Sequence, residues 1–372
     1  MNNPFANLLS SFSKKSTSVI GIDIGSSSIK VVQLKKKGGR GVLETYGEIA
    51  LGPYGGTNVG RASFLTADKL AEAVKDLLKE SNTTTTDSGM SIPINSSLVT
   101  FIKLPTNDEK KIPEMVPIEA RKYIPVPISE VSLDWFAIPK DESTVSEYQN
   151  GQKVKKEDFG IEVLVVVINN DALNKNKDIQ KLAALNTTFS EIEIFSNIRS
   201  VLDPSMSPQA IIDFGAGSTK VFIVERGILR ASHIISRGSQ DITLAISKST
   251  NISFEDAEKI KRNQGLLEQS TDKGALEVST LTIDYILAEA NRVILNYYNK
   301  NGKKISKVVL AGGGSLLLGL KERTEKVLGI QVEIADPFSK VDYPAFMDEI
   351  LKKAGPEFAV AIGLAIRKLQ EI

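Results

Sequence analysis

The sequence predicts an α/β fold made of two related lobes, and three observations support this prediction. The segment GIDIGSSSIKVVQL, residues 21–34, joins two apolar strands through an aspartate and a turn of glycine and serine. IIDFGAGSTKVFIV, residues 211–224, repeats this construction about half a chain later, as expected for a duplicated architecture. Elsewhere strand patterns alternate with helical ones, which is typical of two sheets with helices around them.

Composition excludes several classes of protein. The 372 residues suffice for two domains, and a formal net charge of +1 gives no basic field for nucleic acid. The chain has no cysteine, which excludes disulfides and thiolate chemistry, and one histidine, His233, which lies in a predicted strand and is interpreted as structural. No apolar stretch is long enough for a transmembrane helix, and the N-terminus does not resemble a secretory signal.

The two repeated hairpins have the composition of an anion-binding site. Backbone N–H groups converge in a turn of glycine and serine, and hydroxyl groups add further donors. The aspartate that ends each first strand, Asp23 or Asp213, would repel a bare phosphate, so we expect Mg²⁺ between them. Two ordinary β-turns with Asx-turns are the alternative, which the match between the repeats disfavours. Aligning the two aspartates also matches Gly25 with Gly215, Ser28 with Ser218, Lys30 with Lys220, and Val31 with Val221.

A third glycine cluster follows a buried strand in ISKVVLAGGGSLLLGLKERTEKVLGI, residues 305–330. A strand, a glycine turn and a helix N-terminus together form a corner that suits an anion or a nucleotide. The cluster matches neither GxGxxG nor GxxxxGK[ST], so the two nucleotide-binding folds that carry those motifs are not supported.

These three segments, in this order, resemble the phosphate-1 hairpin, the phosphate-2 hairpin and the adenosine loop of the actin-like ATPase superfamily, which includes actin, Hsp70, sugar kinases and FtsA. GPEFAVAIGLAIRKL, residues 355–369, resembles the last connecting helix of that fold. The resemblance implies an actin-like ATPase fold in which two lobes close on ATP and Mg²⁺.

Within the superfamily, residues 18–372 are most similar to the PilM family of type IV pilus assembly proteins. Besides the serine triplet of the first hairpin, three stretches carry this resemblance: PIEARKYIPVPISEVSLDWFAI at 117–138, IEVLVVVINNDALNKNKDIQKLAAL at 161–185, and RGSQDITLAISKSTNISFEDAEKIKR at 237–262. The first resembles part of an inserted subdomain of the FtsA 1C type. The last resembles a helix pair whose Ala-Glu-x-x-Lys element lies near the base and ribose.

The resemblance implies the cofactors ATP and Mg²⁺ and a set of residues that bind them. Asp23 and Asp213 would hold the magnesium ion, mostly through water. The nucleotide-binding residues implied are Asp23, Gly25, Ser26, Ser27, Ser28, Lys30, Asp213, Gly215, Ala216, Gly217, Ser218, Thr219, Lys220, Gly238, Glu258, Lys261, Gly312, Gly313, Gly314, Ser315 and Leu318.

Hydrolysis of ATP is a weaker prediction than its binding. In EIEIFSNIRSVL, residues 191–202, Glu193 aligns with the residue that orients the attacking water in actin-like proteins, but Ile194 stands where many relatives carry proline. Glu193 is the catalytic candidate, and the alternative is a surface carboxylate at a helix start. We therefore expect at most a weak ATPase.

The resemblance also implies a protein partner, the cytoplasmic tail of a PilN-like membrane protein. The groove that binds it is expected near Tyr123, Ile124, Pro125 and Pro127. The protein would then be cytoplasmic and peripheral to the inner membrane, with membrane contact through this partner or through an amphipathic N-terminal tail. Self-association is a further option, and nucleic acid is not an expected partner.

The domain organisation follows from the same patterns. The predicted parts are a tail at 1–18, a first lobe (1A) at 19–87, 169–206 and 355–372, an inserted subdomain (1C) at 88–168, a second lobe (2A) at 207–238 and 305–354, and a mostly helical part (2B) at 239–304. The polar segment 141–158 is interpreted as a long exposed hairpin loop. The apolar stripe of the helical part is predicted to be core; it consists of Leu281, Tyr285, Leu287, Val293, Leu295 and Tyr298.

Two other functions are kept as alternatives. An FtsA-like cell-division or filament-forming ATPase carries a C-terminal amphipathic membrane helix, whereas this chain ends at RKLQEI directly after the last connecting helix. A small-molecule kinase of the same superfamily needs a substrate pocket with an acidic base, for which the sequence has no signature. An ATP-binding scaffold is therefore the preferred prediction.

Overall fold

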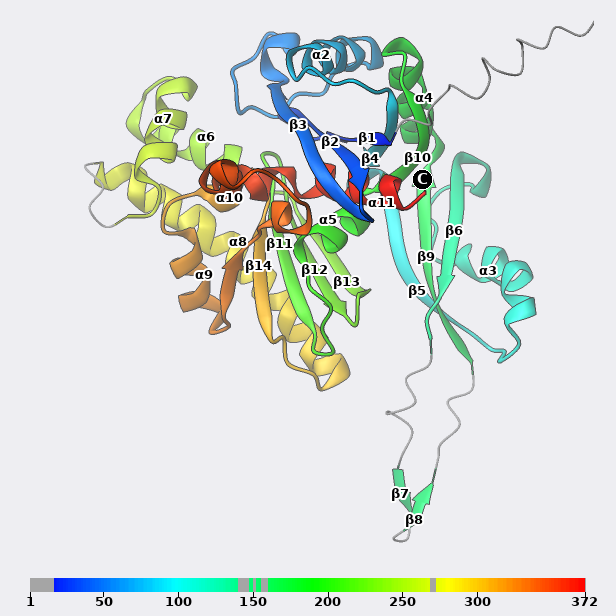
Figure 1. The fold of residues 1–372 in the computed structure, drawn as a ribbon. Coiled ribbons are helices and arrows are strands. Elements are labelled where there is room, and N and C mark those ends of the chain that lie inside the picture. The colour runs from blue at the N-terminus through cyan, green and yellow to red at the C-terminus, as the bar shows by residue number, and fades with distance from the viewer. Residues whose placement is uncertain (1–16, 140–146, 150–151, 155–159, 268–271, 372) are drawn as a thin grey trace, which may run out of the picture. The chain divides into compact units, whose positions relative to one another are not determined.

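A computed structural model describes residues 17–139, 147–149, 152–154, 160–267 and 272–371 (Figure 1). The chain forms two compact units. The large unit comprises Met1–Ser91 and Asp178–Ile372, and the small unit comprises Ile92–Lys177. The predicted helix of the N-terminal tail and most of the predicted loop at 141–158 lie outside the described residues.

The large unit contains two five-stranded sheets with the same strand order. The order is β10-β4-β1-β2-β3 in one and β15-β14-β11-β12-β13 in the other. In each sheet a hairpin pairs antiparallel (β1 with β2, β11 with β12), and its first strand pairs parallel with a later strand (β4 or β14). The predicted duplication is thus confirmed. The first sheet has the strands β1 (Ser18–Ile24), β2 (Ser28–Lys37), β3 (Arg40–Ala50), β4 (Asp87–Ile92) and β10 (Asn186–Ile192). The second has β11 (Gln209–Phe214), β12 (Thr219–Glu225), β13 (Ile228–Ile235), β14 (Lys307–Ala311) and β15 (Val332–Ile334).

Helices cover both faces of the first sheet. Alternate residues of β1 face opposite sides, so that Ile20 and Ile22 join the core under α2 (Ala67–Glu80), while Val19 joins the core under α11 (Ala359–Gln370). On α2, Leu70, Val74 and Leu77 are buried at helical spacing. The helix α5 (Glu193–Val201) belongs to this half, and α4 (Asn170–Leu182) contains the boundary between the small and the large unit at Lys177 and Asp178.

Two glycines let α11 lie unusually close to its neighbours. A Cβ atom on Gly21 of β1 would lie 1.9 Å from the carbonyl oxygen of Ala361. A Cβ atom on Gly363 of α11 would lie 2.0 Å from the carbonyl oxygen of Ser196 on α5. Backbone therefore meets backbone on both sides of α11, and no larger residue fits at either glycine.

The second sheet has its own core, which it forms with helices that follow β13 in the sequence. These helices are α6 (Ser239–Thr250), α7 (Phe254–Gln264), α8 (Lys273–Asn301) and α9 (Leu320–Leu328), and α10 (Asp348–Ala354) follows the sheet. The longest of them, α8, buries Ile283, Ile286, Leu287, Ala290 and Ile294 in this core.

The prediction that the apolar stripe of α8 is core is wrong for most of its members. Leu287 is buried, but Leu281, Tyr285, Leu295 and Tyr298 are exposed. Because α8 is apolar around most of its circumference, spacing alone could not tell which of its two apolar faces meets the sheet. The face with the branched residues Ile283, Ile286 and Ile294 is the buried one.

The small unit is built on a three-stranded antiparallel sheet of order β5-β9-β6. Its elements are β5 (Ser97–Leu104), α3 (Ile112–Ala120), β6 (Val131–Ala137) and β9 (Ile161–Asn169), and β7 (Glu147–Gln149) pairs with β8 (Gln152–Val154). The buried residues of α3, Ile112, Val116 and Ala120, form one core with this sheet.

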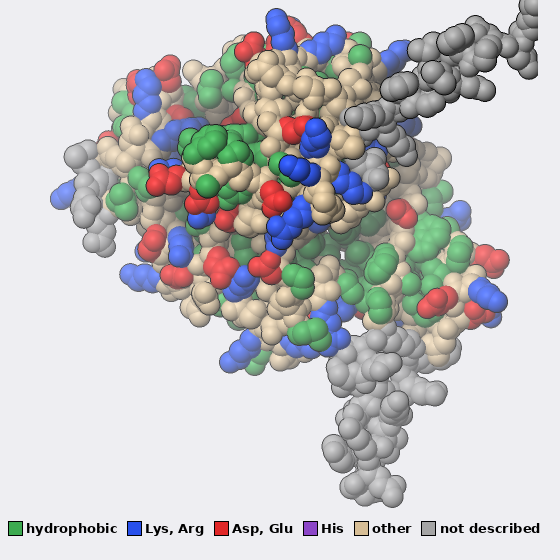
Figure 2. Space-filling model, viewed as in Figure 1, with side chains coloured by type: hydrophobic (Ala, Val, Ile, Leu, Met, Phe, Trp, Pro, Cys, Tyr) green, Lys and Arg blue, Asp and Glu red, His purple; other side chains and the backbone are tan. Residues whose placement is uncertain are grey.

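None of the helices in the described part of the chain combines the length and the apolar character needed to cross a membrane. Figure 2 shows Lys and Arg side chains interspersed with Asp and Glu side chains on the face in view, in keeping with the net charge near zero.

Candidate functional site

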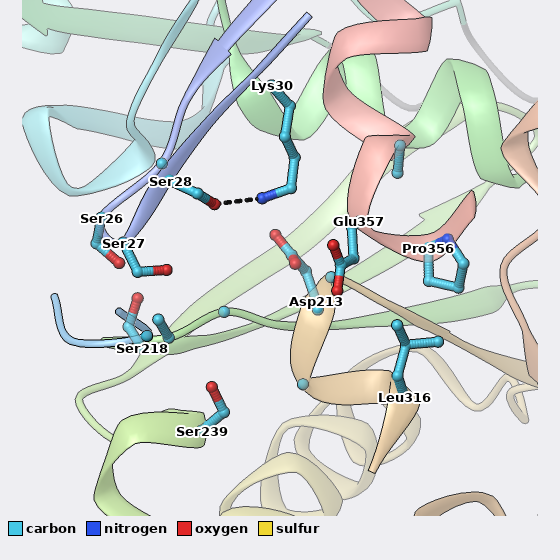
Figure 3. A pocket seen from close by; sticks show the side chains of 18 of the residues that line it. Ser26, Ser27, Ser28, Lys30, Asp213, Ser218, Ser239, Leu316, Pro356 and Glu357 are labelled. Carbon is cyan, nitrogen blue, oxygen red and sulfur yellow. Dashed lines mark hydrogen bonds between the residues drawn. The ribbon is translucent and has the colours of Figure 1, made fainter. Parts of the chain in front are cut away.

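A pocket of about 360 Å³ in the large unit is lined by the turns of both hairpins. This volume lies within the range of small-molecule sites, about 300–1,000 Å³. Figure 3 shows Ser26 and Ser27 of the first turn opposite Ser218 of the second. The predicted residues that line the pocket are Asp23, Gly25, Ser26, Ser27, Ser28, Lys30, Glu193, Asp213, Gly215, Ala216, Ser218, Lys220, Glu258, Lys261, Gly312, Gly313 and Gly314.

The two hairpins match in geometry as well as in sequence. Asp23 lies opposite Lys30 in the β1–β2 register, and Asp213 lies opposite Lys220 in the β11–β12 register. The N–H of the first turn glycine in each hairpin donates to the carbonyl of the serine three residues on, over 3.0 Å in one turn and 3.1 Å in the other. Each lobe therefore presents a carboxylate, an amine and a turn of small residues to the pocket.

Lys220 contacts two carboxylates of the pocket. Its Nζ lies 2.7 Å from Glu193 Oε2 and 3.4 Å from Asp213 Oδ2. Burial alone would lower the pKa of Lys220, but the neighbouring carboxylates of Asp213 and Glu193 raise this pKa above its usual value. Glu193 is buried at the first residue of α5, so the interpretation of Glu193 as a surface carboxylate is wrong.

Asp23 holds its charge less readily than an exposed aspartate does. Burial, and then the nearby charge of Glu193, raise the pKa of Asp23 to about 6. The ammonium of Lys30 does not pair with Asp23. It donates to Ser28 Oγ over 2.6 Å (Figure 3) and lies 2.9 Å from Glu48 Oε1. A cation added beside Asp23 would stabilise its ionised form.

The glycine turn after β14 positions Asp213. Gly312 has φ 78°, which favours glycine, and a Cβ atom there would lie 2.4 Å from Asp213 Oδ1. Its N–H donates to the carbonyl of Pro356 over 2.9 Å. The predicted adenosine loop thus lies directly against the aspartate of the second hairpin.

The helices α6 and α7 form the opposite wall through a buried ion pair. Glu258 Oε2 lies 2.7 Å from Lys261 Nζ and accepts from Thr243 Oγ1 over 2.6 Å, while Arg262 Nε donates to Glu258 Oε1 over 2.7 Å. Burial lowers the pKa of Lys261, because its pairing with Glu258 only partly offsets desolvation.

A segment of the first half crosses to this wall. The N–H of Ala62 donates to Gln240 Oε1 on α6 over 3.0 Å, and the guanidinium of Arg61 lies 5.9 Å from the ring centre of Phe254 on α7. Gly60, beside them, lines the pocket. Residues 60–62, named here the crossing segment, therefore join the two halves at the edge of the pocket.

Five predicted residues do not line the pocket but lie behind its wall. Gly217 faces Ala62, and Gly238 lies against the backbone of Ala216. Leu318 lies against Gly265. The remaining two make hydrogen bonds to backbone carbonyls: Thr219 Oγ1 donates to Arg237 O over 2.9 Å, and Ser315 Oγ donates to Gly312 O over 2.7 Å.

The pocket also contains residues that sequence reasoning missed. Glu48 follows from the β2–β3 register, which places it opposite Lys30. Burial, and then the nearby Glu48, raise the pKa of Glu357 to about 7, and Figure 3 shows Glu357 beside Asp213. Asn197 lies one turn after Glu193 on α5 and is 1% exposed, and neither atom of its amide has a hydrogen-bond partner among the described residues.

In the small unit the four residues predicted to bind a partner lie after α3. Tyr123, Pro125 and Pro127 are exposed, and Ile124 is partly buried against the core of the unit. Further exposed apolar side chains of this unit are Ile118, Val126 and Phe136.

The comparisons with known proteins agree with this architecture. The family described as type IV pilus assembly protein PilM matches residues 21–369. The solved PilM-PilN type IV pilus biogenesis complex contains a chain with a TM-score of 0.77 and 25% identity, covering 94% of this chain and 98% of that one. The ethanolamine utilization protein EutJ from Carboxydothermus hydrogenoformans shares the fold, with a TM-score of 0.54 and 15% identity over 94% of this chain and 89% of its own.

A more distant relative is the cell division protein FtsA of Neisseria meningitidis. It is 27% identical over 175 residues, which are 41% of this chain and 41% of FtsA. The chain therefore spans about two fifths of the length of this curated relative. From the match over 21–369 and the duplicated fold, we conclude that the chain has the actin-like ATPase fold and belongs to the PilM family of type IV pilus assembly proteins.

Proposed function

We propose that the protein is a scaffold of the type IV pilus assembly machinery that binds Mg-ATP and the cytoplasmic tail of a PilN-like membrane protein. One observation carries the nucleotide part: two hairpins with the same carboxylate, lysine and serine turn face one pocket. Membership of the PilM family, and the likeness to a chain of the PilM-PilN complex, support the partner. The protein would act at the inner membrane through that partner.

The phosphates fit between the two turns. Ser26, Ser27 and Ser218 offer hydroxyl and backbone donors there, and charge-assisted bonds of this kind contribute on the order of 1.5–3 kcal/mol each. Lys30 adds a positive charge from the first lobe. The nucleoside would extend between the glycine turn and the wall of α6 and α7, where Ile242 and Leu316 supply apolar contact.

The residues present also fit a magnesium ion. Asp23 and Asp213 would hold it, and few carboxylates suit Mg²⁺, which keeps several waters and takes oxygen ligands from phosphates. No cluster of three or more metal-binding side chains occurs in the described ranges, and water and the phosphates would supply the remaining ligands. Bound there, the ion would neutralise charge between the aspartates and the triphosphate.

Slow hydrolysis follows from the same contacts. Glu193, the candidate for orienting water, is held by Lys220 at 2.7 Å. The ammonium takes up part of the acceptor capacity of this carboxylate, which leaves fewer lone pairs to orient water. ATP would therefore act mainly by fixing the relation of the two halves, because it contacts both hairpins and favours the arrangement in which they close.

Calorimetry on the full chain tests the proposal as a whole. Mg-ATP should bind at one site per chain, and a peptide with the cytoplasmic sequence of a PilN-like protein should bind with an affinity that differs with and without ATP. Absence of heat with both ligands would reject the proposed function.

Asn197 gives a sharper test of the pocket. Asn197→Leu should raise the free energy of unfolding of the nucleotide-free protein by about 1–2 kcal/mol, because a buried amide without partners is costly. The same variant should bind Mg-ATP several-fold more weakly, because leucine has no amide group to donate a hydrogen bond to the bound molecule. Urea unfolding and calorimetry measure the two effects. A loss of stability with unchanged affinity would contradict a ligand-binding role for this side chain.

The exposed apolar residues of the small unit should bind the peptide. Tyr123→Ala should weaken peptide binding by about 10-fold, as for an aromatic residue at an interface, without changing Mg-ATP affinity. Phe346→Ala is the matched control, because Phe346 is an exposed aromatic residue of the large unit. Equal losses of peptide affinity in both variants would contradict the proposal that this surface of the small unit binds the peptide.

A further inference from the structure

The side of α8 that faces away from the core carries a regular stripe. Leu281, Tyr285, Ala288, Arg292 and Leu295 follow one another at alternating intervals of four and three residues, and all five are exposed. These five residues are named here the α8 stripe. Such spacing is that of a two-helix seam, in which each side chain packs between residues of a facing helix.

The large apolar side chains of the α8 stripe are unusually exposed to solvent. Leu281 is 63% exposed, Tyr285 54% and Leu295 50%. The core of the second half needs none of them, because the opposite face of α8 already covers the sheet through Ile283, Ile286 and other buried residues. A repeated apolar seam on the outside of a helix indicates a partner surface.

The α8 stripe is complementary to itself. Turned about a twofold axis through Ala288, Leu281 of one copy lies opposite Leu295 of the other, and Tyr285 lies opposite Arg292. The first pair is apolar, and the second places a guanidinium against an aromatic ring. Alanine at the axis is small enough to let the two helices approach closely.

Charge selects the antiparallel direction. Acidic side chains, Glu277 and Asp284, flank the N-terminal half of the stripe, whereas Arg292 and Lys300 belong to its C-terminal half or follow it. An antiparallel pair brings opposite charges together, and a parallel pair brings like charges together. Asp284 lies beside the stripe and pairs with Arg323, while Arg292 within the stripe pairs with Glu289 of its own chain.

We propose that the occupant of the α8 stripe is a second copy of this chain, bound antiparallel through a symmetric α8–α8 contact. A twofold contact uses the same surface on both copies, as the pairing of Leu281 with Leu295 requires. The seam covers about 20 Å of helix at 1.5 Å per residue, less than a standard interface. Dissociation constants on the order of 10–100 µM are therefore expected.

Cysteine pairing tests both the contact and its direction. The chain has no cysteine, so Leu281→Cys and Leu295→Cys each introduce a single thiol. An equimolar mixture of these two full-length variants should form disulfide-linked dimers under mild oxidation, while each variant alone should remain largely monomeric. Ile350→Cys, at a residue of α10 that is similarly exposed, is the control and should give only background with either variant.

Sedimentation equilibrium provides the second measurement. The wild-type chain should shift from monomer to dimer between about 1 and 200 µM, and Leu281→Glu should weaken this association at least ~10-fold. Circular dichroism should show the same fold, because Leu281 lies on the surface. A wild-type chain that stays monomeric throughout, or cross-linking by each cysteine variant alone that equals the mixture, would overturn the proposal.

Discussion

Asp213→Ala should abolish Mg-ATP binding, with a loss of affinity on the order of 100-fold or more. The carboxylate of Asp213 lies in the pocket, is 6% exposed, and is fixed between Lys220 and the glycine turn at Gly312. Its proposed task is to hold a magnesium ion against the triphosphate. Calorimetry at saturating Mg²⁺ measures the loss, and circular dichroism checks that the fold is retained.

A measurement without metal distinguishes the loss of the proposed magnesium bridge at Asp213 from a general disturbance of the pocket. Without Mg²⁺ the Asp213 carboxylate repels the triphosphate, so in EDTA the variant should bind ATP at least as well as the wild type. The exposed Asp178 serves as control, and Asp178→Ala should leave both affinities unchanged. Equal losses for the Asp213 variant with and without the metal would contradict the proposed bridge.

Gly363→Ala should destabilise the large unit by at least about 3 kcal/mol, the upper end of the usual range for an overfilled core. The added Cβ atom would meet the carbonyl oxygen of Ser196 at 2.0 Å, and backbone atoms of α5 cannot rotate away as a side chain can. Urea unfolding of the full chain, with the near-ultraviolet signal of the folded state, measures the effect.

Gly274→Ala is the matched control for that substitution. Gly274 lies in the first turn of α8, where a Cβ atom would meet only Asp272 Oδ1 at 3.5 Å. Alanine is the better helix former, so this variant should be neutral or slightly more stable. If both alanine variants unfold at the same urea concentration, the close contact between α11 and α5 does not require glycine at position 363.

The repeated hairpins were predictable from sequence because their chemistry is local. A strand, an aspartate, a glycine and a serine turn fix the backbone within a few residues, so Asp23 and Asp213 could be matched before any fold was known. The same register places a lysine opposite each aspartate in its hairpin. Helix faces were harder: α8 has two apolar faces, and spacing did not reveal that Leu281 and Leu295 point outward.

The rest of the pocket depends on distant segments. Glu357 reaches it from just before α11, and Asn197 reaches it from the second turn of α5. No local pattern marks either residue, since an Asn in a helix and a Glu after proline are common on surfaces. Glu48 could have been predicted from the sequence, because the pairing of β3 with β2 places it opposite Lys30.

The crossing segment bears on how long a nucleotide stays bound. Ala62 and Arg61 join the first half to α6 and α7 at the edge of the pocket, so movement of the two halves away from each other would have to break these contacts. Release of the proposed nucleotide would then depend on the opening rate of the protein as well as on the strength of its phosphate contacts. A long-lived nucleotide suits an assembly part that must keep one shape through many encounters with its neighbours.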